Sequence, residues 1–170
     1  MAQFNFHNLD SVTRNLMLSE IHSDIEHRKL YESERLNETG RKNYQSYLIK
    51  SVTEGDEVLL ENLLEINTHF NQTYFRVDKH VKMPSNASTL LSQSEFNRFY
   101  IRAICLRAIT DGINNVQIYR ARESSWARPE SEAKIGTLVS AKELLEDLRN
   151  SIGTEPKLFP EINSGLSVKI

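Results

Sequence analysis

The sequence predicts a mostly helical α+β fold with about five helices, a small sheet or ribbon, and extended termini. Three observations support this fold class. Apolar residues recur at the 3.6-residue spacing of a helix in several stretches, most densely over residues 94–111. A short stretch, residues 116–121, alternates apolar and polar side chains as a half-buried strand does. The chain has 170 residues, enough for a core of its own, so we predict a single domain over residues 1–170.

The spacing of apolar residues places five helices in chain order. They cover residues 11–28, residues 41–54, a stretch that follows Asp56, residues 94–111, and a stretch that follows the capping box of Ser140 and Glu143. The helix over 94–111 is apolar around more than half of its circumference, so we expect it to be the central helix. Glu20 and Asp24 lie opposite the apolar side of the first helix and are expected to face solvent.

The remaining segments are predicted to be extended or irregular. Residues 73–83 alternate in part, which favours an exposed ribbon or arm, and residues 84–88 read as a loop. Residues 1–9 show no helical pattern and are predicted to form an extended N-terminal segment. The C-terminal segment over 154–170 contains two prolines and a glycine but is too apolar for plain disorder. We expect it to dock on its own domain or on a neighbouring subunit.

The composition narrows the class of protein. The formal net charge is −2, whereas a protein that works mainly by gripping phosphates usually carries a clear basic excess. Nucleic acid is therefore not the expected main partner, although a local basic patch is compatible with this charge. Cys105 is the single cysteine, so no internal disulfide can form. No apolar run approaches the roughly 18 residues that span a bilayer, so we expect no membrane partner.

No group of residues matches a catalytic, metal or cofactor motif. The five histidines are scattered, and the six glycines never cluster as a phosphate-binding loop requires. Cys105 lies in the most apolar predicted helix, which indicates a buried structural thiol rather than a nucleophile. We predict a non-enzymatic protein without catalytic residues, metal or cofactor.

Arginines gather between residues 94 and 136, a stretch that contains few acids. They are Arg98, Arg102, Arg107, Arg120, Arg122 and Arg128. A guanidinium group favours carboxylates and phosphates because its donors match two oxygens at once. Three interpretations are open: an internal lattice of salt bridges, a protein–protein interface, and a site for nucleic acid or another anion.

Trp126 is the only tryptophan and lies in the polar loop ESSWARPES. A tryptophan beside arginines is typical of an interface anchor, and the alternative is a tryptophan that folds down over the core. The candidate interface combines this loop with the end of the chain, and its residues are Arg120, Arg122, Trp126, Arg128, Asn163, Leu166, Val168 and Ile170. The arginines would pair with carboxylates across the interface.

Several phrases of the chain resemble one family of proteins. The phrases are EFNRFYIRAICLRAITDGI, VQIYRAR, RPESEAKIGTLV, AKELLEDLR and NSGLSVKI, with FNFHNLDSVTRNLMLSEI and LYESERLNETGRKNY near the start. They are similar to short virion and morphogenesis proteins encoded by tailed bacteriophages, and the similarity is weakest between Glu65 and Ser92. The resemblance implies a head or head–tail neck component, present in the virion after synthesis in the host bacterial cytoplasm. Its implied partners are portal, capsid or tail subunits and further copies of the chain in a homo-oligomer.

The favoured hypothesis is therefore a non-enzymatic structural protein of a tailed bacteriophage particle that acts through subunit contacts. The alternative is a nucleic-acid-binding or regulatory phage protein, whose binding would weaken steeply with ionic strength. A third hypothesis is a small inhibitor directed at the host, or an enzyme with an unfamiliar site.

Overall fold

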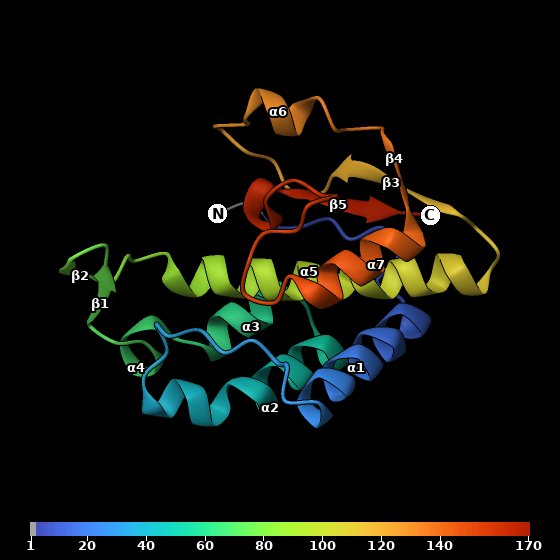
Figure 1. Cartoon of the computed structure of the whole chain (residues 1–170). Helices are drawn as coiled ribbons and strands as arrows, with labels where there is room; N and C mark the ends of the chain where they lie inside the picture. Colours follow the sequence, from blue (N-terminus) through green and yellow to red (C-terminus); the bar gives the residue numbers. More distant parts are fainter. Residues whose placement is uncertain (1–2) are drawn as a thin grey trace. The chain divides into compact units, whose positions relative to one another are not determined.

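Figure 1 shows a computed structural model of the chain, which describes residues 3–170. The described residues form seven α-helices and two small antiparallel sheets, which confirms the predicted α+β, mostly α fold class. The chain divides into two compact units, Tyr31–Phe96 and the combination of Met1–Leu30 with Asn97–Ile170. The prediction of one domain over 1–170 stays a prediction, and each unit is described by itself.

The unit Tyr31–Phe96 begins with three helices. They are α2 (Glu38–Glu54), α3 (Glu57–Leu63) and α4 (Ile66–His69). Asp56 caps α3 as predicted, because its carboxylate accepts hydrogen bonds from the backbone amides of Val58 and Leu59. Gly40 permits close approach of α2 to α4, since a Cβ atom there would lie 2.1 Å from the carbonyl oxygen of His69. Fully buried apolar side chains of this unit include Leu36, Tyr44, Leu48, Val52, Leu60, Leu64 and Phe96.

A β-hairpin follows these helices, and it confirms the predicted ribbon. Strands β1 (Thr73–Arg76) and β2 (Lys79–Lys82) pair in antiparallel register, with Phe75 opposite His80. The base of the hairpin is fixed to its own unit, because the guanidinium of Arg35 lies 4.4 Å from the ring centre of Tyr74. Most other side chains of the two strands are exposed.

Helix α5 (Ala87–Thr110) begins earlier than the sequence predicts, inside the expected loop over 84–88. Its first turns carry polar side chains that find acceptors on α3. The hydroxyl of Ser88 donates to the carbonyl oxygen of Leu64 at 2.7 Å, and that of Thr89 donates to the Glu61 carboxylate at 2.6 Å. These bonds allow a polar stretch to be helical and buried. The later part of α5 is the most buried helix, as expected, with Phe99, Tyr100, Ile104, Cys105 and Ala108 at most 1% exposed.

The other unit is built from α1, most of α5, a three-stranded sheet and α7. The elements not yet given are α1 (Ser11–Glu26), β3 (Asn115–Arg120), α6 (Pro129–Glu132), β4 (Leu138–Ser140), α7 (Ala141–Asn150), a 3₁₀ turn (Ile162–Ser164) and β5 (Leu166–Lys169). The antiparallel strand order is β4–β3–β5, with Val116 opposite Val139 and Ile118 opposite Val168. The capping box before α7 is confirmed in part, since the hydroxyl of Ser140 accepts from the amide of Glu143.

The described N-terminal residues and the C-terminal segment are both docked on this unit. Phe4 packs against Tyr119 and Ala121, and the backbone amide of Asn5 donates to the carbonyl oxygen of Ala121 at 2.7 Å. At the other end, the predicted extended segment includes β5, which pairs with β3. Of the two alternatives for the C-terminal segment, the structure therefore shows docking on its own domain.

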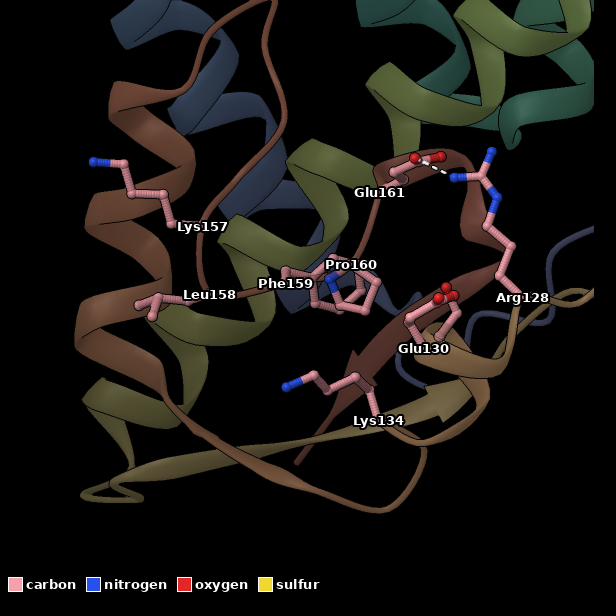
Figure 2. Close-up of a pocket in the computed structure, with 9 residues that line it drawn as sticks. Arg128, Glu130, Lys134, Lys157, Leu158, Phe159, Pro160 and Glu161 are labelled. Carbon is pink, nitrogen blue, oxygen red and sulfur yellow. Dashed lines mark hydrogen bonds and ion pairs between the residues drawn. The ribbon is translucent and has the colours of Figure 1, made fainter.

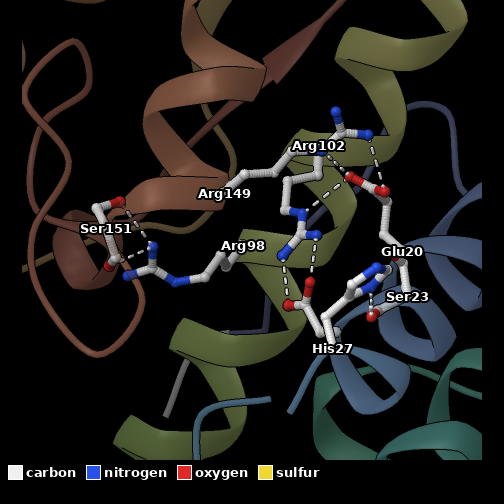
Figure 3. A network of polar contacts seen from close by, with 8 residues as sticks. Glu20, Ser23, His27, Arg98, Arg102, Arg149 and Ser151 are labelled. Atoms are coloured by element: carbon white, nitrogen blue, oxygen red, sulfur yellow. Dashed lines mark hydrogen bonds and ion pairs between the residues drawn. The ribbon is translucent and has the colours of Figure 1, made fainter. Parts of the chain in front are cut away.

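A buried ion network joins α1, α5 and α7 (Figure 3). Arg102 is 1% exposed, and it donates to Glu20 at 3.0 Å and to both oxygens of Asp24 at 2.7 and 2.8 Å. Arg149 donates to both oxygens of Glu20 at 2.9 and 3.0 Å. The expectation that Glu20 and Asp24 face solvent is therefore wrong: both are buried, because a buried guanidinium needs paired anions.

We expect Arg102→Met to destabilise this unit by about 3–5 kcal/mol, because the substitution leaves the buried carboxylate of Asp24 without its cation and removes one of the two cations of Glu20. Arg107→Met is the matched control, because Arg107 pairs with an exposed carboxylate of Asp10. That substitution should cost less than about 1 kcal/mol. Urea denaturation followed by circular dichroism measures both, and equal losses would contradict a special role for the buried network.

The network also predicts a pH dependence. Burial of Glu20 works against its charged form, but hydrogen bonds and charge from Arg149 and Arg102 outweigh burial and hold its pKa below the ordinary 4.5. A lowered carboxyl pKa stabilises the folded state fully above pH 4.5, and this contribution is lost as pH falls through the folded pKa. Unfolding free energies measured from pH 6 down to about pH 3 should therefore fall less steeply for Glu20→Gln than for the parent chain. Parallel curves would show that Glu20 is not the titrating group.

Candidate functional site

Trp126 lies in the loop between β3 and α6, and its side chain is 90% exposed. The alternative that this tryptophan folds down over the core is therefore wrong. An exposed indole ring offers a large, rigid apolar surface together with one hydrogen-bond donor, which is why tryptophan is enriched at protein interfaces. The structure places the ring where another molecule can cover it.

Two arginines fasten the base of this loop to the C-terminal segment. The guanidinium of Arg120 donates to the carbonyl oxygen of Ser164 at 3.0 Å and forms an ion pair with Glu132. Arg122 donates to the carbonyl oxygen of Asn163 at 2.8 Å. Gly165 completes the junction with a φ of +82°, and a Cβ atom there would lie 2.7 Å from the carbonyl oxygen of Arg122. Arg120 therefore pairs with a carboxylate of its own chain, and both arginines bind backbone carbonyl oxygens of residues 163 and 164.

Arg128 is the most exposed arginine of the candidate interface, and it lines a surface pocket of about 460 Å³ (Figure 2). It forms an ion pair with Glu161, whose side chain is itself about half exposed. The walls of the pocket come from the α6 region and from residues 157–161, and they include Glu130, Lys134, Lys157, Leu158 and Phe159. The pocket mixes both signs of charge with apolar side chains, as the rim of a protein interface does.

The remaining candidates at the C-terminus differ from one another. Leu166 and Val168 are 0% exposed in β5, so their side chains belong to the core of their own unit and not to a free surface. Asn163 is half-buried, and its carbonyl oxygen is occupied by Arg122. Ile170 is 42% exposed and stays accessible. The structure thus reduces the accessible part of the predicted interface to Trp126, Arg128 and Ile170.

The other arginines of the cluster also have partners inside the chain. Arg98 donates to the carbonyl oxygens of Ser151 and Thr154 at 3.2 and 2.9 Å. Arg107 pairs with Asp10 at 2.7 Å. Sequence reasoning could not find most of these partners, because a backbone carbonyl is present at every residue and leaves no signal in the sequence.

Burial favours the neutral forms of two interior groups, the thiol of Cys105 and the hydroxyl of Tyr100. Burial raises the pKa of Cys105 to about 12, so the thiolate is suppressed at neutral pH. Burial also raises the pKa of Tyr100, whose hydroxyl accepts a hydrogen bond from the amide of Asn8. Within residues 3–170, no three histidine, cysteine, aspartate or glutamate side chains lie together as a metal site would need.

None of the helices in the described part of the chain is long and apolar enough to cross a membrane. Comparison of the chain with models of protein families, with curated proteins and with solved structures gives no match.

We expect Trp126→Ala to change the free energy of unfolding by no more than about 0.5 kcal/mol, since the ring contributes little to the core. Leu166→Ala should cost about 2–5 kcal/mol, because it leaves a cavity under the sheet. Thermal or urea denaturation of the isolated protein measures both. A large loss from Trp126→Ala would mean that the loop is structural and that the site is wrongly placed.

Proposed function

We propose that this chain is a non-enzymatic structural protein of a tailed bacteriophage particle, in the head or the head–tail neck. It joins portal, capsid or tail subunits and further copies of itself through subunit contacts. The observation that carries the proposal is the 90% exposure of Trp126 on a loop whose base is fixed by Arg120 and Arg122. The resemblance to phage virion proteins is the reason for proposing the phage particle as the assembly.

A fixed loop that presents an exposed tryptophan is well suited to bind another protein. Association orders side chains and loops, and that ordering costs free energy. Here the hydrogen bonds from Arg120 and Arg122 already order the base of the loop in the free chain. The ring of Trp126 can then contribute its apolar area to a contact, and the charged side chain of Arg128, two residues further along the chain, can lie at the rim.

The test is to detect the chain in purified particles of its phage and to vary Trp126. We expect the protein in intact particles by mass spectrometry, and Trp126→Ala should lower its incorporation at least about tenfold, as loss of an interface anchor worth about 2 kcal/mol would. Leu138→Ala is the matched control, because Leu138 is another exposed apolar side chain, at 64%, of the same unit. Absence of the chain from particles would overturn the proposal.

The alternative, a nucleic-acid-binding protein, predicts a different dependence of binding on ionic strength. Phosphate binding weakens steeply as ionic strength rises, whereas a contact anchored by an apolar ring does not. A protein that binds oligonucleotides with a steep salt dependence and is missing from particles would favour that alternative.

A further inference from the structure

The tip of the β1–β2 hairpin combines exposed apolar and cationic side chains that no part of its own unit covers. Phe75 is 64% exposed and Val77 is 83% exposed. Arg76, Lys79 and Lys82 are exposed as well, and across residues 3–170 their side chains form no ion pair. Residues 73–82 carry these three cations against the single carboxylate of Asp78, in a chain whose net charge is −2.

Two features of the tip lower the stability of the hairpin on its own. Val77 has a φ of +56°, a left-handed conformation that strongly disfavours β-branched residues and that hairpin turns normally give to glycine or asparagine. Arg76 lies directly opposite Lys79 in the strand register, and like charges in that position repel each other. Backbone strain of this kind clusters at functional sites. An anion of a partner that lies between the two cations would remove their repulsion.

The same chain carries a groove of about 470 Å³ beside α7, lined by four carboxylates and one cation, Lys157. Glu143 and Glu146 line it from exposed positions of the helix, and within residues 3–170 their side chains form no ion pair or hydrogen bond. Asp147 and Glu155 add two carboxylates, whose oxygens accept backbone hydrogen bonds of the C-terminal segment. Leu158, 45% exposed, gives the groove an apolar surface.

We propose that the β1–β2 hairpin of one copy docks in the α7 groove of a second copy. Arg76 and Lys79 would pair with Glu143 and Glu146, and the side chain of Val77 would lie against the apolar surface of the groove. The two surfaces are different, so the contact is head-to-tail and leads from copy to copy around a ring if the rotation closes. This inference rests on the proposed structural role, for which it names one partner and one contact.

Complementarity favours a second copy over nucleic acid as the occupant. The hairpin presents two exposed apolar side chains beside its cations, and the groove offers both carboxylates and an apolar side chain to receive them. A phosphate backbone would satisfy the cations alone. Unpaired charges of opposite sign on two surfaces of the same chain fit the electrostatic complementarity of specific interfaces.

The experiment reverses each charged surface and then both. The hairpin variant is Arg76→Glu with Lys79→Glu, and the groove variant is Glu143→Lys with Glu146→Lys. We expect the parent chain to form an oligomer by light scattering, and we expect each variant alone to raise its dissociation constant at least about a hundredfold, because like charges then face each other. The chain that carries both reversals, and an equimolar mixture of the two variants, should recover the oligomer.

The control is Lys42→Glu with Lys50→Glu, a reversal of equal charge on exposed positions of α2 in the same unit as the hairpin. It should leave the oligomer unchanged. Circular dichroism of every variant separates a lost contact from a lost fold. A monomeric parent chain, or reversals that both break the oligomer without mutual rescue, would overturn the inference.

Two further outcomes separate this inference from the proposed function. If the protein is present in phage particles but monomeric in isolation, the hairpin contact is wrong and the structural role is supported. If the double reversal restores the oligomer but the protein is absent from phage particles, the structural role is wrong and the hairpin contact is supported. Binding of a labelled oligonucleotide that only the hairpin variant loses, with its oligomer intact, would assign the hairpin to nucleic acid and overturn the inference.

Discussion

The fold of the discontinuous unit depends on one constraint, the charge of Arg102 in its interior. Burial of a guanidinium is costly unless anions are placed against it, and Glu20 and Asp24 supply them from α1, about 80 residues earlier in the chain. Arg149 of α7 completes the network by pairing with Glu20. Helices from three distant parts of the sequence are thereby held in one arrangement.

The same kind of contact secures the irregular parts of this unit. Arg98 holds residues 151 and 154, whereas Arg120 and Arg122 hold residues 163 and 164, in each case through backbone carbonyl oxygens. A segment with two prolines and little regular structure leaves many carbonyl groups without a strand or helix partner. Guanidinium groups satisfy several of these at once, since each carries five donors. This arrangement suits a chain whose hydrophobic content is only 39%, because hydrogen bonds fix segments that a larger apolar core would otherwise hold.

Local patterns predicted the parts of the fold that depend on local physics. Asp56 and Ser140 cap helices because a cap acts within three residues, and the alternation over β1, β2 and β3 reflects the geometry of a single strand. The wrong predictions for Glu20, Asp24, Leu166 and Val168 involve partners far away in the sequence. Glu20 looked like a solvated residue because nothing near it reveals Arg102. The residue composition of its loop predicts that Trp126 is an interface candidate, and its side chain is exposed. The burial of Leu166 and Val168 depends on the pairing of β5 with β3, which the sequence of the C-terminal segment does not specify.

A cluster of arginines in the sequence is thus a weaker guide to an interface than charged side chains that have no ion pair in the folded chain. The cluster between residues 94 and 136 stands out in the sequence, yet most of its guanidinium groups bind carbonyls and carboxylates of their own chain. Arg76 and Lys79 lie in the segment predicted to be an exposed ribbon, and among residues 3–170 their side chains form no ion pair. A cation that is already paired must give up one partner to gain another, so its net contribution to binding is small. An unpaired cation beside an exposed apolar side chain has no such cost, which is why the hairpin, and not the arginine cluster, is the better place to look for an electrostatic contact between copies.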